Sequence, residues 1–206
     1  MIKAVIKQTD RFEVLKEFLE KYLADRWIDE FGNIDEKYKK NKDKIEEELK
    51  LKFESICKFG ISLQEQGLKG EIKYIYFSVL RTSLLLKNKG EFRLDLYDER
   101  WFLDKAECSI NISLDFIYEL FFKHIEELKE KKKGYVRNIR EVDIDYIMLE
   151  EANKYHILAA EFLKDIIENL LEVPAYKKLK KMEDIKIMAG EYMDFTEIIY
   201  TKQEGS

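Results

Sequence analysis

The stretch EIKYIYFSVLRTSLLLKNKGEFRLDLYDERWFLD, residues 71–104, decides the fold. Its first part is rich in β-branched and aromatic residues, which favour strands. The Lys-Asn-Lys-Gly sequence at 87–90 is a turn signal. Apolar and polar side chains then alternate over 92–97, which indicates a strand with one face toward a core. If residues 100–103 pair back after a second turn, the segment forms a three-stranded meander over about 72–104.

The first strand of this meander is open to a second interpretation. An apolar stripe at spacings of three and four residues also fits a helix over the same segment. The members of this stripe are Ile72, Tyr76, Val79, Ser83 and Leu86. Residues 72–86 are therefore either strand or helix.

Two amphipathic helices precede the meander. The first starts at the N-cap Asp10 and stops at Gly32-Asn33, a left-handed C-cap signal. The second carries apolar residues at near-heptad spacing from Ile34 to Leu63 and ends before Gly67. We predict that the two form a helical hairpin over 10–66. The alternative is a partner-binding coiled coil, for which an apolar repeat of about four heptads is short.

The rest of the chain predicts an α+β fold. Helical periodicity spans 112–133 and 143–172, and the second of these helices is apolar nearly all round, which is typical of a core helix. Alternation predicts C-terminal strands within 185–200, where Gly190 indicates a bulge or a close approach. We predict a single domain over 1–206, with about four main helices packed on a mostly antiparallel sheet.

Composition restricts the class of protein. Apolar residues make up 46% of the 206 residues, enough for a core without metal or disulfide support. The 37 Lys and Arg residues are balanced by 42 Asp and Glu residues, which gives a net charge of −5 and argues against nucleic acid as the main partner. A third hypothesis is nucleic-acid binding by the basic runs Lys37–Lys44 and Lys177–Lys181, but runs this short are typical of solvated surfaces.

Compartment and cofactor expectations also follow from the sequence. No apolar run is long enough for a membrane span or a secretory leader, so we expect a soluble, cytoplasmic protein. Two cysteines, Cys57 and Cys108, do not make a disulfide framework. The richness in Lys, Glu and Ile is similar to that of proteins from AT-rich bacteria. The GxGxxG, GxxxxGK[ST], HExxH, GxSxG and CxxC motifs are absent, so we expect no cofactor and no metal.

The polar face of the meander is our first candidate ligand site. Alternation places the polar residues of 92–97 on one face, and Arg81, in an otherwise apolar run, needs a partner. Arginines beside an aromatic ring and a carboxylate bind carboxylates or phosphates through bidentate hydrogen bonds. The alternative is a solvated sheet face with cross-strand Arg–Asp pairs. The residues of this first candidate are Arg81, Arg93, Asp95, Tyr97, Arg100 and Trp101.

Two histidines suggest a second candidate. His124, Glu151 and His156 lie on apolar helical stripes, where they would form an acid–base or metal cluster. The Glu-x-x-His motif of di-metal bundles is absent at both histidines. The alternative is a pair of buried histidines bound to Tyr or backbone groups, with Glu151 at a helix–helix rim.

These features favour a non-catalytic interaction or regulatory module that binds a protein partner or a second copy of the chain. The absence of catalytic motifs, the charged amphipathic helices and the sequence Trp101-Phe102-Leu103 support this hypothesis. The alternative function is an enzyme or small-anion binder that uses the polar face around Arg81, Arg93, Asp95 and Tyr97.

Overall fold

The computed structural model describes residues 11–24, 26–135, 138–192 and 196–201. The elements follow in the order α1 (Arg11–Tyr22), α2 (Arg26–Glu65), β1 (Ile72–Val79), α3 (Arg81–Lys87), β2 (Glu91–Tyr97), the 3₁₀ turn η1 (Trp101–Leu103), β3 (Ser109–Ser113), α4 (Asp115–Lys132), the 3₁₀ turn η2 (Lys133–Tyr135), α5 (Glu141–Leu171), α6 (Pro174–Lys178), β4 (Lys181–Glu191) and β5 (Thr196–Thr201). The predicted α+β class, the two helices after the meander and the C-terminal strands are confirmed.

One sheet of five strands, in the order β3-β2-β1-β4-β5, organises the described residues. Three neighbouring pairs are antiparallel, as predicted, while β1 and β4 run parallel. Parallel neighbours need a long connection, and here the whole segment from α3 to α6 supplies it. Of the two C-terminal strands, β4 therefore lies beside the central strand β1, and β5 forms one edge of the sheet.

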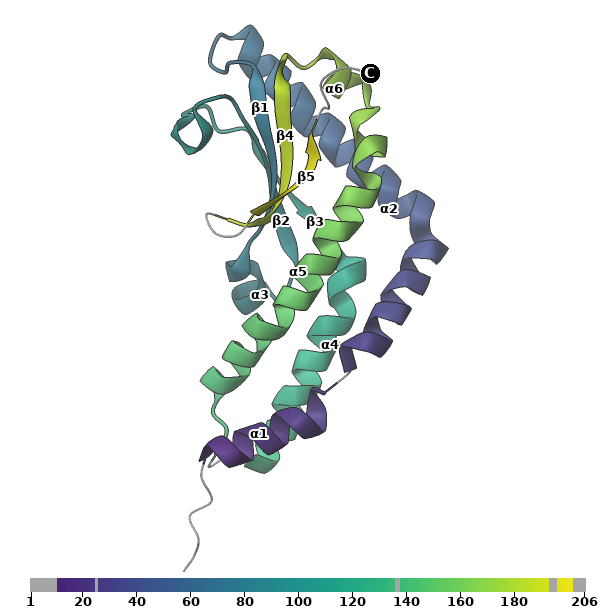
Figure 1. Ribbon diagram of the computed structural model, residues 1–206, viewed down its shortest axis with the longest axis vertical. Coiled ribbons are helices and arrows are strands. Elements are labelled where there is room, and N and C mark those ends of the chain that lie inside the picture. Colours follow the sequence, from purple (N-terminus) through teal and green to yellow (C-terminus); the bar gives the residue numbers. More distant parts are fainter. Residues whose placement is uncertain (1–10, 25, 136–137, 193–195, 202–206) are drawn as a thin grey trace, which may run out of the picture.

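The two faces of the sheet have different covers. Ile75, Phe77 and Val79 of β1 pair with Leu96, Leu94 and Phe92 of β2, and all six are buried toward the helices. Figure 1 shows α5 running diagonally past the sheet, with α4 and α2 beside it. The buried residues of α5 extend from Ile144 to Leu171, which confirms that this helix is central to the core. Gly90, immediately before β2, permits close packing, since a Cβ there would overlap the ring of Tyr118 on α4.

The first strand ends earlier than the apolar run predicts. Residues 72–79 form a strand, as the first interpretation predicts, and residues 81–87 form the helix α3, as the second predicts. A strand over the whole of 72–86 is therefore wrong. The β-ladder stops at Val79, and the hydroxyl of Ser83 lies 2.7 Å from the carbonyl oxygens of both Leu80 and Lys89. This local bonding competes with the ladder. Asn88 then ends the helix with a left-handed backbone (φ 48°).

The third strand is β3, and the prediction that residues 100–103 pair back is wrong. The carboxylates of Asp98 and Asp104 accept hydrogen bonds from the backbone N–H groups of Arg100, Asp98 and Ala106. These bonds hold the segment as a loop around η1. Residues 112–113, predicted as the start of the third helix, lie in β3 instead, and α4 begins at Asp115.

The predicted helix stop at Gly32-Asn33 is also wrong, because α2 runs through both residues. Gly32 is exposed, where a helical glycine costs only about 1 kcal/mol, and the neighbouring Ile34 is buried. The helices separate instead between Tyr22 and Arg26, and α1 crosses the far ends of α4 and α5 (Figure 1). Residues 11–66 therefore do not form a hairpin that turns at Gly32, and the predicted N-cap Asp10 lies outside the described residues.

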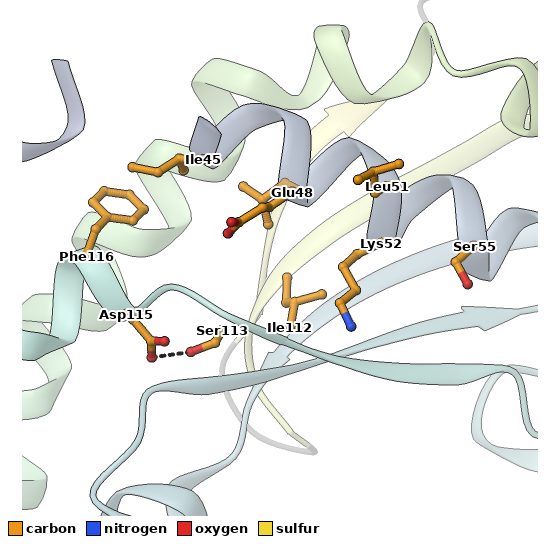
Figure 2. A pocket seen from close by; sticks show the side chains of 10 residues that line it. Ile45, Glu48, Leu51, Lys52, Ser55, Ile112, Ser113, Asp115 and Phe116 are labelled. Atoms are coloured by element: carbon orange, nitrogen blue, oxygen red, sulfur yellow. Dashed lines mark hydrogen bonds between the residues drawn. The ribbon is translucent and has the colours of Figure 1, made fainter. Parts of the chain in front are cut away.

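A groove lies between α2 and the edge strand β3. It has a volume of about 540 Å³ and continues to the start of α4. Figure 2 shows Glu48 and Lys52 of α2 at this opening, with Ile112 on the β3 side and Phe116 at one end.

Candidate functional site

The polar face of the meander is covered, not solvated. Arg93, Asp95 and Tyr97 share a face, as the alternation predicts, but Asp95 is only 1% exposed. The ring of Trp101 in η1 lies 4.3 Å from that of Tyr74 and 5.4 Å from that of Tyr97, measured between centroids. Phe102 and Tyr192 extend this aromatic cover. The alternative of a wet sheet face is therefore wrong.

Each candidate arginine is paired with carboxylates. Arg93 contacts Asp95 at 2.9 Å and Glu107 at 3.0 Å, and its guanidinium lies over the ring of Tyr192. Asp95 belongs to the same strand, so the pair is not cross-strand. Burial raises the pKa of Asp95 despite the hydrogen bonds from Arg93. Arg81 lies 2.6 Å from Glu191. A role for these residues in anion binding stays a prediction, and it requires these pairs to open.

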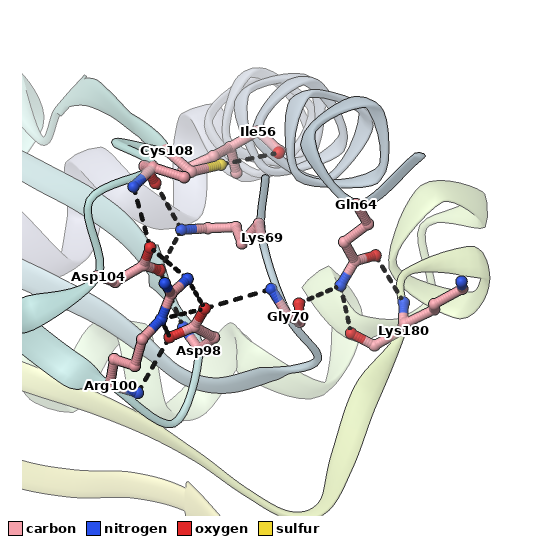
Figure 3. Close-up of polar contacts among 10 residues, drawn as sticks. Ile56, Gln64, Lys69, Gly70, Asp98, Arg100, Asp104, Cys108 and Lys180 are labelled. Atoms are coloured by element: carbon pink, nitrogen blue, oxygen red, sulfur yellow. Dashed lines mark hydrogen bonds and ion pairs between the residues drawn. The ribbon is translucent and has the colours of Figure 1, made fainter. Parts of the chain in front are cut away.

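A buried ion pair fixes the loop that carries η1. Lys69 and Asp104 are fully buried and contact each other, and Lys69 also donates to the carbonyl oxygen of Ala106 at 2.6 Å. Figure 3 shows Asp98 between Arg100 and the backbone N–H of Gly70. Burial alone would raise the pKa of Asp98, but these hydrogen bonds lower it to about 2. Arg100 therefore has a structural role in holding the aromatic cover.

The second candidate cluster is not assembled. His124 lies 3.6 Å from Glu30 and 3.3 Å from the carbonyl oxygen of Tyr22. Glu151 pairs with Lys154, and His156 bonds to Tyr118. Within the described residues, no group of three or more His, Cys, Asp and Glu side chains is placed to hold a metal ion. The two histidines are instead buried and bound to a tyrosine hydroxyl (His156) and a backbone carbonyl (His124), as the alternative predicts.

A pocket between α5 and the sheet is lined by one residue of the second candidate set and by the ion-pair partner of one residue of the first. It has a volume of about 220 Å³ and lies where β1 and β4 end and β2 begins. His156 lines it, and so does Glu191, the partner of Arg81. The complete lining is Val79, Phe92, Asn153, His156, Ile157, Ala160, Ala189, Gly190, Glu191 and Glu197.

The side-chain oxygen of Asn153 is buried in this lining without a hydrogen-bond partner. It is the sole buried side-chain nitrogen or oxygen in the described part of the chain with that property. Leaving a buried polar group unsatisfied costs about 1–3 kcal/mol. Such a group in a pocket therefore needs an explanation outside the stability of the free protein.

His156 has a fixed orientation and no charge at neutral pH. Burial, together with the positive charge of Arg81, lowers its pKa to about 4. Tyr118 is fully buried, its pKa is well above 10, and its hydroxyl lies 2.5 Å from Nδ1 of His156. Because a buried hydroxyl proton needs an acceptor, we infer that Tyr118 donates to Nδ1, which leaves the proton of the imidazole on Nε2.

Sequence reasoning missed Asn153, Glu191 and Glu197. Asn153 interrupts the apolar surface of α5, and that polar residue in a core helix is the signal that could have identified it. Gly190 was predicted to mark a bulge or a close approach. Its φ of 154° lies outside the range that other residues favour, and a register shift between β4 and β5 occurs at Ile187 and Met188.

No family model, curated protein or solved structure matches the chain. Among the described residues, no helix is both long and apolar enough to cross a membrane. The arrangement of side chains is therefore the basis for a functional proposal.

Proposed function

We propose that the protein binds a small molecule in the pocket between α5 and the sheet, hereafter the α5 pocket, without transforming it. The buried, unpartnered oxygen of Asn153 carries this proposal. Ligand pockets combine apolar walls with a few polar groups that fix orientation. Here the walls are formed by Val79, Phe92, Ala160 and Ala189.

The volume of the α5 pocket suits a compact ligand. An engineered apolar cavity of about 150 Å³ in another protein accepts benzene. At about 220 Å³, the α5 pocket has space for a six-membered ring with a short substituent.

The titratable groups support binding rather than catalysis. Nδ1 of His156 is occupied by Tyr118, and the low pKa of the imidazole makes it a poor base at neutral pH. Burial raises the pKa of both thiols, Cys57 and Cys108, to about 12, and neither lines the pocket. A buried thiol with a raised pKa is a poor nucleophile.

An NMR titration tests the proposal, with benzyl alcohol as the probe. We expect the largest shifts at the backbone amide of Gly190 and the side-chain amide of Asn153. The variant Ala160→Phe fills the pocket and removes these shifts. Ile157→Trp narrows the pocket from an exposed position, so it also serves if the first variant fails to fold. Shifts that are absent, or that persist in a folded filling variant, would overturn the proposal.

The free edge of β3 supports a second candidate function, the binding of an extended peptide. The backbone N–H of Leu96 on β2 donates to the carbonyl oxygen of Cys108. Since every second residue of an antiparallel strand bonds to the same neighbour, the backbone groups of Ile110 and Ile112 also bond to β2. The backbone groups of Ser109, Asn111 and Ser113 therefore point away from β2, beside the groove of Figure 2. A peptide strand would pair with them and place alternate apolar side chains against Ile112 and the apolar residues of α2.

Charge argues against a second copy of the chain as the occupant of this edge. A twofold pairing of β3 centred on Asn111 would bring Glu107 and Asp115, which flank the two ends of the strand, near each other, and like charges at short distance repel. A hexapeptide of alternating Thr and Val is a suitable probe. We expect it to shift the amide of Asn111 in wild type and in Asn111→Ala, but not to bind Asn111→Pro, which lacks the N–H. Binding to Asn111→Pro, or a dimer that this variant dissociates, would contradict peptide binding.

A further inference from the structure

The polar groups of the α5 pocket are mainly hydrogen-bond acceptors. The oxygen of Asn153 is one, and the carboxylates of Glu191 and Glu197 are two more. The side chain of Glu197 has no ion pair or hydrogen bond with any residue in the described ranges. Besides the side-chain NH2 group of Asn153, the donor we assign to the lining is Nε2–H of His156. A ligand that completes these bonds therefore has to supply donors.

The charges at the pocket are unequal. Glu191 is neutralised by Arg81, whose NH2 group lies 2.8 Å from Oε1 and 2.6 Å from Oε2. Glu197 contributes a second carboxylate without a matching cation among the described residues. His156 is neutral and adds no positive charge. This excess negative charge disfavours an anionic ligand, and it does not depend on how the Asn153 amide is turned.

The walls require that only one end of the ligand is polar. Val79, Phe92 and Ala189 come from the helix-facing side of the sheet, and Ala160 comes from the facing side of α5. A charged group against these residues would lose its hydration without replacement bonds. The apolar part of a ligand belongs there, and its donor group belongs at Asn153 and Glu197.

We propose that the ligand class of the α5 pocket is a compact primary amine with an apolar body, whose ammonium group binds Asn153 and Glu197. This inference rests on the proposed function. An ammonium group has three donors and no acceptor, which matches the acceptors of the lining. The charge-assisted bond to Glu197 is the stronger of the two contacts.

Four probes with a common ring separate the ligand class from binding itself. Benzylamine, benzyl alcohol, toluene and benzoate are titrated at pH 7 into the full chain, with the amide of Gly190 as the reporter. We expect benzylamine to bind about tenfold tighter than toluene, a difference of about 1.4 kcal/mol. Benzyl alcohol falls between them, and benzoate is the weakest.

Two variants assign the preference to a residue. Glu197→Gln is expected to lower the affinity for benzylamine to that for benzyl alcohol, while the affinity for toluene stays unchanged. Glu183→Gln, at an exposed position near the start of β4 and outside the lining, is the matched control and leaves the order intact.

The outcomes distinguish the two claims. Equal affinities for all probes, abolished by Ala160→Phe or Ile157→Trp, would overturn the amine inference and leave the proposed function standing. Tightest binding of benzoate would overturn the inference in the same way. No binding of any probe would overturn both.

Discussion

At the scale of the residue, the buried amide of Asn153 lowers the stability of the free protein and, in our proposal, binds the ligand. Replacing a buried unsatisfied polar group by an apolar group of similar shape removes its desolvation penalty. We therefore expect Asn153→Leu to raise the free energy of unfolding by about 1 kcal/mol in urea denaturation, and to lose benzylamine binding. The matched control on α5 is Asn169→Leu, whose amide already bonds to Glu46. A destabilised Asn153→Leu that still binds the amine would show that this amide has a structural role.

His156 makes stability depend on pH. Its folded pKa of about 4 lies below the ordinary 6.5, so the unfolded chain binds more protons between these values. Its contribution is complete above pH 6.5 and is lost as the pH falls toward 4, by up to about 3 kcal/mol at 1.36 kcal/mol per pKa unit. Arg81, Tyr118, Glu191 and Glu197 all lie around this imidazole.

The measurement that checks this is urea denaturation of wild type and His156→Gln at pH 7 and pH 4.5. The free energy of unfolding of wild type is expected to fall more steeply than that of the variant. Parallel losses in the two proteins would assign the acid sensitivity to other groups, such as His124, whose pKa burial also lowers.

At the scale of the element, the loop of residues 98–107 depends on one buried cation. Lys69→Met removes the buried cation that pairs with Asp104 and leaves, among the described residues, only the ion contact with Arg100 at 3.3 Å, which costs about 3–5 kcal/mol. We expect this loss in urea denaturation, with a red shift of tryptophan emission as Trp101 becomes exposed. Lys73→Met removes the more exposed pair with Asp184 and is the control, at about 0–1 kcal/mol. Equal stabilities of the two variants would refute the role of Lys69.

Elements with a long periodic pattern were predictable, and elements set by single side chains were not. The apolar face of α5 and the alternation in β2 predict their structures because burial is what selects them. The η1 loop depends on the carboxylates of Asp98 and Asp104, and Asp104 pairs with Lys69, 35 residues earlier in the chain. Helix α3 could not be predicted with certainty of type, because the residues of Arg81–Lys87 occur in strands and in helices alike.

At the scale of the whole molecule, the candidate site could not be predicted because strand order was not. The sequence predicts C-terminal strands, but periodicity does not reveal that β4 runs parallel to β1. That neighbour relation brings Glu191 beside Val79 and closes the α5 pocket between α5 and the sheet. The need of Arg81 for a partner was predictable, while the partner itself, 110 residues away, was not.

The most direct test of the central claim is a crystal structure of the protein soaked with benzylamine. We expect the ring between Phe92 and Ala160, with the ammonium group within hydrogen-bond distance of the side-chain oxygen of Asn153 and of the Glu197 carboxylate. An empty α5 pocket, with the Asn153 amide bonded to another group of the protein, would contradict it.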